Sequence, residues 1–520
     1  MSELKQFFRN SQVMAAMTAL SRVFGLVRDQ LTNFLLGTTR LADIWVIAFM
    51  LPNLFRRLMA EGVMSSAFVP LLSEITATDE DAPDREAEAL AFARAMFSLI
   101  LLAATLLITG IVLTLPWILP FLMKWMTPSG RENDPEFYAR LILPTRLLFP
   151  YILFISLAAI CQGVLNVKNR FALPSFTPIV LNVCIIGFGF GLRHWHGNPL
   201  WGLCVGVLVG GFFQFFLQWL QLHRIGFRLA PTLRIMGPRT REAIRLWFPT
   251  TFSAGIVQIN ALISTAVAAN LFEGASMALF NSTRMMELVL GVFAAAISTS
   301  ILPLLSRQRG RDDHSGLNNS LWAGLTVMSL VTIPAAVGLI LAGPSVLSLL
   351  FQRGAFNDHS LNLTYTALLF HAMALIPISW YRILSQTFYA HKQVLVSVAI
   401  AGVAAVVNIY CCFRLPTLFD RDLAHCGIAL ATLISSWLLM GIALWQIYRR
   451  YHVRWPRVFT WDLVRITLAT AAFVPLWLPF GIELLSPFAL ILKIISSILV
   501  YIILIYVLQV SALPRILRKK

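Results

Sequence analysis

The chain has 520 residues, of which 58% are hydrophobic and only 12% are charged. Soluble domains carry about 25% charged residues, so this composition excludes a soluble enzyme or binding domain. The formal net charge is +17. In a soluble chain this excess would suggest a nucleic-acid partner, but in a membrane protein Lys and Arg gather in cytoplasmic loops. We therefore expect an all-α polytopic membrane protein that binds no nucleic acid.

Apolar runs of about 20 residues, enough to cross roughly 30 Å of hydrocarbon, recur along the whole chain. The N-terminus is short and basic and leads into the first run without a cleavable signal peptide, and the longest polar stretch, 73–94, is expected to be a loop. The fourteen predicted spans are 11–37, 41–72, 91–119, 138–165, 172–192, 199–222, 243–272, 276–305, 318–346, 361–389, 393–413, 424–448, 461–480 and 485–510. Most loop Lys and Arg fall in alternate loops, in the set that includes both termini. The positive-inside rule then predicts that both termini are cytoplasmic.

The two halves of the chain repeat at a nearly constant spacing, between 225 and 227 residues. The matched positions are Pro150 with Pro377, Asn182 with Asn408, and Gly202 with Gly427. This pattern predicts two pseudo-symmetric six-helix bundles in parallel orientation, with a substrate site between them near the midplane. We expect an N-terminal lobe at 1–225, a C-terminal lobe at 226–450, and a final segment at 451–520 that holds spans 13 and 14 and a basic C-terminus.

Seven arginines lie inside predicted spans and away from the span ends: Arg22, Arg28, Arg56, Arg57, Arg146, Arg284 and Arg382. Insertion scales put an arginine at a helix centre at about 2.5–3.5 kcal/mol, so these side chains must face a water-filled cavity or pair with other groups. The intramembrane acids are fewer: Asp29, Asp43, Glu61 and Glu287. We therefore expect a net positive cavity whose cargo is an anion.

Span 1 carries Arg22 and Arg28 on either side of Gly25. Six residues correspond to about 600° of helix, so the two arginines do not form one tight stripe. A bend at Gly25 would bring both toward one cavity. The alternative is that Arg28 pairs with neighbouring Asp29 near an interface.

Span 2 contains Pro52 and Gly62, which predict a broken helix, and the adjacent pair Arg56 and Arg57. Adjacent side chains point about 100° apart, so one of the two should face the cavity. We favour Arg56 because Asn53 lies one turn away on its side. Arg57 then snorkels or pairs with another group.

Span 8 carries Arg284 and Glu287 at i and i+3, on one helix face. They form either a self-satisfied ion pair or a pair that exchanges partners, in which the arginine meets an anion and the acid helps to release it. Arg146 and Arg382 lie in the repeat-equivalent spans 4 and 10, as cavity or interface residues.

No enzyme motif is present: the sequence has no Walker loop, no His-Glu-x-x-His and no plausible Ser/His/Asp set. The six cysteines lack metal-ligand spacing and are typical of small core residues. The histidines lie mainly in predicted loops, where we expect them to be solvated: His194, His196, His391 and His425. We therefore expect a transporter without catalytic residues, metal or cofactor.

Motifs across nearly the whole chain resemble the MurJ/MviN lipid II flippases of the MOP exporter superfamily. The most specific are Ser21-Arg22-Val23-x-Gly25-x-x-Arg28-Asp29, Leu51-Pro52-Asn53-Leu54-x-Arg56-Arg57-x-x-Ala60-Glu61-Gly62 and Ala67-Phe68-Val69-Pro70. Further likeness lies in Phe149-Pro150-Tyr151-Ile152-Leu153, Asn169-Arg170-Phe171 and Leu350-Phe351-Gln352-Arg353-Gly354. Fourteen spans also fit this family.

The resemblance implies a MATE-like fold that flips undecaprenyl-pyrophosphate-linked disaccharide-pentapeptide to the outer leaflet of the bacterial inner membrane, for peptidoglycan synthesis, cell-wall biogenesis and cell shape. It implies that spans 13 and 14 form a groove for the polyprenyl tail. The expected partners are lipid II, membrane lipids and the cell-wall synthesis machinery, and a monomer should suffice. The substrate-binding residues that it implies are Arg22, Arg28, Arg56, Arg284, Asn53, Asp43 and Glu287, with Asp29, Arg57, Glu61, Arg146 and Arg382 as secondary candidates.

The chain departs from the family in the C-terminal lobe. Thr283 stands where members commonly have an acid before the span-8 arginine, and Met277 stands at a position that is serine in well-known members. No acids in spans 7 and 11 match the sodium site of some members.

Three other functions fit parts of the sequence. A cation-coupled drug exporter would need membrane acids rather than arginines. A flippase for another polyprenyl-linked glycan shares the charge logic. A membrane scaffold would leave the arginines unexplained.

Overall fold

The structure is a computed structural model that describes residues 2–56, 67–77, 83–128, 134–311, 313–477 and 486–511. These residues form helices and connections, without a β-strand among them. By its internal contacts the chain divides into two compact units. Unit 1 is Met1–Thr127 with Glu132–Ala266, and unit 2 is Pro128–Arg131 with Val267–Lys520. The expected boundaries at residues 225 and 450 stay a prediction.

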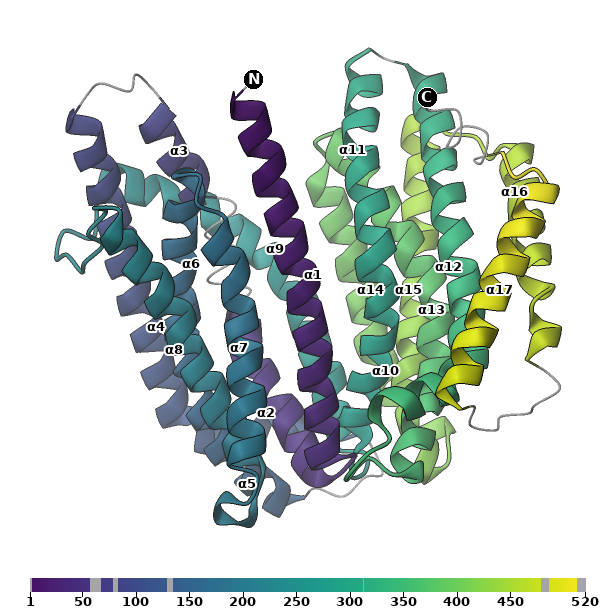
Figure 1. The fold of residues 1–520 in the computed structure, drawn as a ribbon, viewed down its shortest axis with the longest axis horizontal. Helices are drawn as coiled ribbons and strands as arrows, with labels where there is room; N and C mark the ends of the chain where they lie inside the picture. Colours follow the sequence, from purple (N-terminus) through teal and green to yellow (C-terminus); the bar gives the residue numbers. More distant parts are fainter. Residues whose placement is uncertain are drawn as a thin grey trace. The chain divides into compact units, whose positions relative to one another are not determined.

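Unit 1 is a bundle of long helices (Figure 1). Its helices are α1 (Ser2–Leu36), α2 (Arg40–Arg56), α3 (Val69–Ala77), α4 (Pro83–Trp125), α5 (Pro135–Leu148), α6 (Tyr151–Val167), α7 (Ala172–Gly191), α8 (Leu200–Arg224) and all but the end of α9 (Pro238–Ala269). Helices α7 and α8 pack closely because α8 presents glycines to α7. A Cβ on Gly206 would lie 2.7 Å from the Cα of Ile185. Helix α7 in turn packs against α1, so its other face is directed at the arginine-bearing helix.

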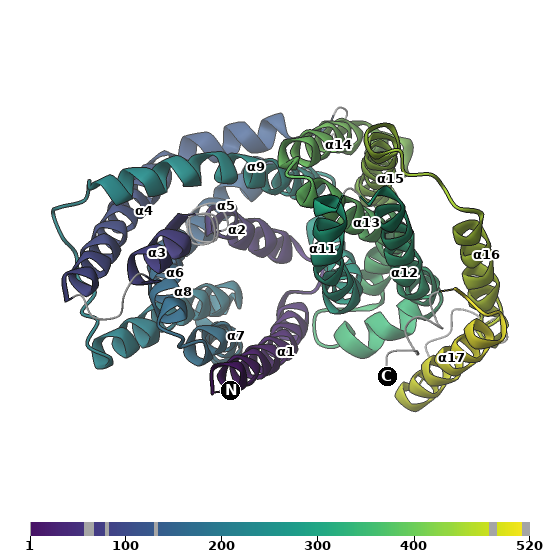
Figure 2. The ribbon, with the colours of Figure 1, turned by 90° about the horizontal axis from the view of Figure 1, so that it is seen from above.

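Unit 2 has its own core. Its helices are α10 (Ala275–Val289), α11 (Ala295–Gly310), α12 (His314–Phe351), α13 (Asp358–Ala390), α14 (Val394–Arg414), α15 (Ala424–Tyr451), α16 (Arg457–Ala471) and α17 (Pro487–Val507). Helix α13 packs against α10, α11, α12 and α15, and a buried aromatic group that includes Trp322, Trp380 and Phe459 lies at one end of the core. Helices α16 and α17 lie beside α12 (Figure 2).

Helix starts in both units follow capping chemistry. The side chains of Asp134, Asp313, Asn357 and Ser486 accept hydrogen bonds from backbone N–H groups in the first turns of α5, α12, α13 and α17. An N-cap oxygen satisfies one of the N–H groups that a helix start leaves without a partner.

Within the described residues, ten helices are long and apolar enough to cross a membrane. The all-helical membrane architecture is confirmed, and the count of fourteen spans stays a prediction. The loop expected at 73–94 is wrong, because α3 continues to Ala77 and α4 already begins at Pro83. The stretch from Arg85 to Arg94 is rich in Ala, Glu, Arg and Leu, which are strong helix formers whatever their polarity.

Candidate functional site

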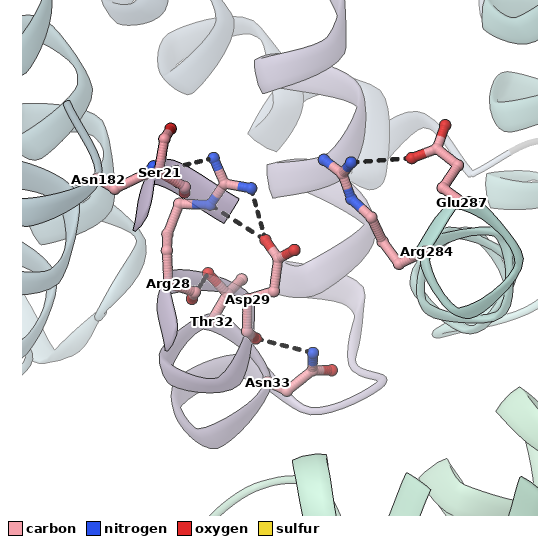
Figure 3. Close-up of polar contacts among 8 residues, drawn as sticks. All are labelled: Ser21, Arg28, Asp29, Thr32, Asn33, Asn182, Arg284 and Glu287. Carbon is pink, nitrogen blue, oxygen red and sulfur yellow. Dashed lines mark hydrogen bonds and ion pairs between the residues drawn. The ribbon is translucent and has the colours of Figure 1, made fainter. Parts of the chain in front are cut away.

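Arg28 on α1 contacts side chains of α1, α2 and α7. Its Nε and Nη2 atoms donate to Oδ1 of Asp29 at 3.1 and 2.6 Å, and its Nη1 donates to Oδ1 of Asn182 on α7 at 3.2 Å (Figure 3). The guanidinium carbon also lies 5.9 Å from the ring centroid of Phe49 on α2. Arg28 thus pairs with Asp29, as the second alternative has it, and also contacts a second helix, whereas its position in a cavity stays a prediction.

The helical turn after Arg28 carries polar side chains that are buried from solvent. Asp29 is 8% exposed and Asn33 is fully buried. The Thr32 hydroxyl donates to the carbonyl of Arg28, and the Asn33 amide donates to the carbonyl of Asp29, both at 2.9 Å. Hydrogen bonds of this kind satisfy short polar side chains within the helix, so this turn remains helical despite its polarity.

Helix α2 brings Asn53 and Arg56 together as their spacing predicts. The Nε of Arg56 donates to Oδ1 of Asn53 at 3.2 Å, and Nδ2 of Asn53 donates to the carbonyl of Phe49 at 2.9 Å. The helix runs without interruption through Pro52 to Arg56, so the break expected in span 2 is not at this proline.

The remaining predicted residues of unit 1 lie in different environments. Arg22 is exposed, and α1 continues through Gly25 as one helix, while the bend expected there stays a prediction. Asp43 is fully buried in the first turn of α2, where a carboxylate faces the positive end of the helix dipole. Arg57 and Glu61 lie outside the described residues.

Arg146 has a structural partner that its sequence position does not reveal. Its Nε donates to the carbonyl of Val112 on α4 at 2.9 Å. Pro116 stands four residues after Val112 and has no N–H to donate to that carbonyl. The arginine of α5 therefore satisfies a backbone group that the proline leaves open.

Unit 2 groups three of the predicted charges. Nη1 of Arg284 donates to Oε2 of Glu287 at 2.9 Å (Figure 3). The Arg284 guanidinium carbon also lies 4.9 Å from the ring centroid of Phe280. Half-buried Arg382 on α13 interacts electrostatically with Glu287. The group carries two positive charges and one negative charge, so the acid is shared between two cations.

The sequence analysis did not predict that two histidines are buried. His425 is fully buried at the start of α15, and its Nε2 lies 2.8 Å from the carbonyl of Leu363, so the solvated loop position expected for it is wrong. Nδ1 of His371 lies 2.9 Å from the hydroxyl of Ser282. Hydropathy alone places a histidine at a helix end, such as His425, outside the membrane. In the structure, α13 packs against α15 and encloses the His425 side chain.

Asn182 was identified in the sequence only as a repeat position, and its contact with Arg28 was missed. The sequence signal that could have indicated this contact is a polar side chain inside an otherwise apolar span. Within the described ranges, no group of three or more His, Cys, Asp or Glu side chains is placed to hold a metal ion.

Comparison with known proteins identifies the family of the chain. A family model described as lipid II flippase MurJ matches residues 32–499. A probable lipid II flippase MurJ of Vibrio cholerae serotype O1 is 31% identical over 86% of this chain and 84% of its own length. The lipid II flippase MurJ of Burkholderia cenocepacia is 30% identical over 85% of both chains.

Solved transporter structures have a fold similar to that of this chain. A lipid II flippase MurJ in an inward closed conformation aligns with a TM-score of 0.76 at 25% identity, over 94% of this chain and 97% of that one. An inward-facing MATE multidrug transporter of the MOP superfamily aligns with a TM-score of 0.64 at 14% identity, over 88% of this chain and 98% of that one, which supports the fold alone. The family match covers most of the chain, so this protein belongs to the MurJ family of membrane transporters.

Proposed function

We propose that this protein flips lipid II, the undecaprenyl-pyrophosphate-linked peptidoglycan precursor, from the inner to the outer leaflet of the bacterial cytoplasmic membrane. Family membership supports the proposal, and the observation that carries it is Arg28. A guanidinium inside an apolar helix is costly unless it is paired or faces a water-filled cavity, and such residues mark substrate pathways. Among the described residues, Arg28 is held by side chains from two helices, and the carboxylate that it bonds is that of Asp29.

The cargo chemistry matches such a group. A pyrophosphate accepts paired N–H bonds from a planar guanidinium, which is also less strongly hydrated than an ammonium. In the proposed mechanism Arg22, Arg28, Arg56 and Arg284 line a cationic cavity that replaces the hydration of the pyrophosphate. Rocking of two bundles then exposes this cavity alternately to the two leaflets, as in other transporters built from repeats.

The remaining roles follow from the same proposal. Asn53, Asp43 and Glu287 tune the site, with Asp29, Arg57, Glu61, Arg146 and Arg382 as secondary candidates. Spans 13 and 14 accommodate the polyprenyl tail, both termini are cytoplasmic, and a monomer is sufficient.

We further propose that the membrane potential assists the cycle. A potential contributes about 2.3 kcal/mol per elementary charge per 100 mV, and an inside-negative potential drives an anion outward or returns an empty cationic cavity inward. In proteoliposomes, an imposed inside-negative potential should speed flipping. Equal rates with and without the potential would disprove the coupling.

The deciding experiment is complementation of bacteria depleted of their own flippase, with growth and outer-leaflet lipid II as readouts. Wild type should rescue, whereas Arg28→Ala at normal membrane level should not. Arg414→Ala, an exposed arginine at the end of α14, is the matched control and should rescue. Failure of wild type that is present in the membrane would contradict lipid II as the cargo. Rescue by Arg28→Ala would remove Arg28 from the mechanism.

A further inference from the structure

Asn182 is a buried polar side chain on α7 whose contacts lead to α1. It is 6% exposed, and its Oδ1 accepts from Nη1 of Arg28 at 3.2 Å. Its Nδ2 donates to the carbonyl of Ser21 at 3.4 Å, almost two turns before Arg28 (Figure 3). The Asn182 amide thus connects α7 to two separate turns of α1.

These two contacts determine the orientation of the amide. If the oxygen and nitrogen were exchanged, an NH₂ group would face the guanidinium N–H groups and a carbonyl oxygen would face the carbonyl of Ser21. Both contacts would then be repulsive. The acceptor oxygen therefore faces Arg28.

The helix backbone of α1 leaves room for this amide. Gly25 lies between Ser21 and Arg28, and a Cβ there would lie 3.9 Å from Nδ2 of Asn182. The side chain of Asn182 thus lies alongside the glycine. A larger residue at position 25 would extend toward the amide that holds Arg28.

The repeat-equivalent residue in unit 2 is also a buried asparagine but has different partners. Nδ2 of Asn408 donates to the hydroxyl of Ser435 at 3.1 Å, and the thiol of Cys412 lies 3.5 Å from its Oδ1. Its hydrogen bonds to described side chains join α14 to α15 and link Asn408 to Cys412 on the same helix. The same repeat position therefore contacts a cation in unit 1 and contributes to helix packing in unit 2.

We propose that Asn182 is a positioning residue for the pyrophosphate-binding arginine: it fixes the Arg28 guanidinium with a neutral acceptor, so that the guanidinium is held in place without a second carboxylate beside Asp29. This inference rests on the proposed lipid II function. Asp29 already supplies one carboxylate to Arg28. A second carboxylate at position 182 would hold the guanidinium equally well but compete with the phosphate oxygens of the cargo.

The test is lipid II binding to the purified full-length protein, measured by titration in nanodiscs together with the thermal unfolding midpoint. Asn182→Ala should weaken binding about tenfold, the effect of losing one hydrogen bond to a charged group. Asn182→Asp should weaken it further through its added negative charge, and should also lower the unfolding midpoint, because its second oxygen cannot donate to the Ser21 carbonyl. Asn408→Ala, the matched control, should lower the midpoint with little effect on affinity.

A double-mutant cycle separates positioning from packing. In the Arg28→Gln background, Asn182→Ala should have almost no further effect on affinity. An undiminished effect in that background would overturn the inference, and so would wild-type affinity in Asn182→Asp. If Arg28→Gln itself binds lipid II like wild type, the arginine site of the proposed function fails. If Arg28→Gln loses binding and Asn182→Ala does not, only the positioning role fails.

Discussion

The hydroxyl of Tyr501 on α17 donates a hydrogen bond of 2.7 Å to the carbonyl of Leu330 on α12. Pro334 stands four residues after Leu330 and has no N–H, so this carbonyl has lost its usual helical donor. Tyr365 repeats the arrangement on the same helix, donating to the carbonyl of Ile340 at 2.9 Å, four residues before Pro344. Each tyrosine satisfies a backbone group that would otherwise lie unpaired in hydrocarbon.

Tyr501→Phe should destabilise the protein by about 1 kcal/mol, because it removes one hydrogen bond between membrane helices and leaves the Leu330 carbonyl open. The measurement is the thermal unfolding midpoint in nanodiscs. Tyr506→Phe is the control, since Tyr506 lies on the same helix and is 68% exposed. Equal shifts in the two variants would contradict a specific role for Tyr501.

Arg146 should contribute to stability through its contact with Val112. Arg146→Gln should cost about 1.5–3 kcal/mol, the value for hydrogen bonds that involve a charged group. In a Pro116→Ala background the new N–H satisfies the Val112 carbonyl, so the same substitution should cost less. Unfolding of the four proteins of this cycle measures the difference. Additive losses would show that the proline and the arginine are not coupled.

Glu287 should control release of the cargo rather than its capture. Glu287→Gln removes the carboxylate that Arg284 and Arg382 share, so anionic lipid should bind more tightly and leave more slowly. Arg284→Gln should weaken binding. Affinity and turnover, measured on the same proteoliposomes, separate the two effects. A Glu287→Gln variant with unchanged affinity and unchanged turnover would support the simple ion-pair alternative.

His391 should make folding sensitive to acid. It follows α13 and packs against Tyr451, with tilted rings whose centroids are 4.1 Å apart. Its pKa is lowered from the ordinary value of 6.5, first by burial and then by the nearby charges of Arg309 and His314. A hydrogen bond to the Thr387 carbonyl opposes this shift. Because the unfolded chain takes up the proton more readily, this contribution is complete above the ordinary pKa and is lost as pH falls below it.

His391→Gln should therefore lose less stability than wild type between pH 7.5 and pH 5.5. Unfolding midpoints at both values give the comparison, and exposed His194→Gln should behave as wild type does. If His391→Gln and wild type respond to acid equally, another group is responsible.

Local contacts of the candidate site could be read from the sequence. Asn53 with Arg56, and Arg284 with Glu287, are three residues apart, and the helical period places such residues on one face whatever surrounds them. The length of the apolar runs likewise indicated helices that cross a membrane, because each backbone N–H and C=O must be paired in lipid.

Contacts between helices depended on the tertiary structure. Asn182 meets Arg28 across 154 positions, and Arg146 meets Val112 across 34. Hydropathy cannot indicate which face of an apolar helix packs against which neighbour. The prediction that His425 is solvated was wrong because hydropathy does not report this packing. The sequence by itself determined that buried arginines require partners, because an unpaired charge in hydrocarbon is too costly. Only the packing of α7 against α1, and of α5 against α4, decided what those partners are.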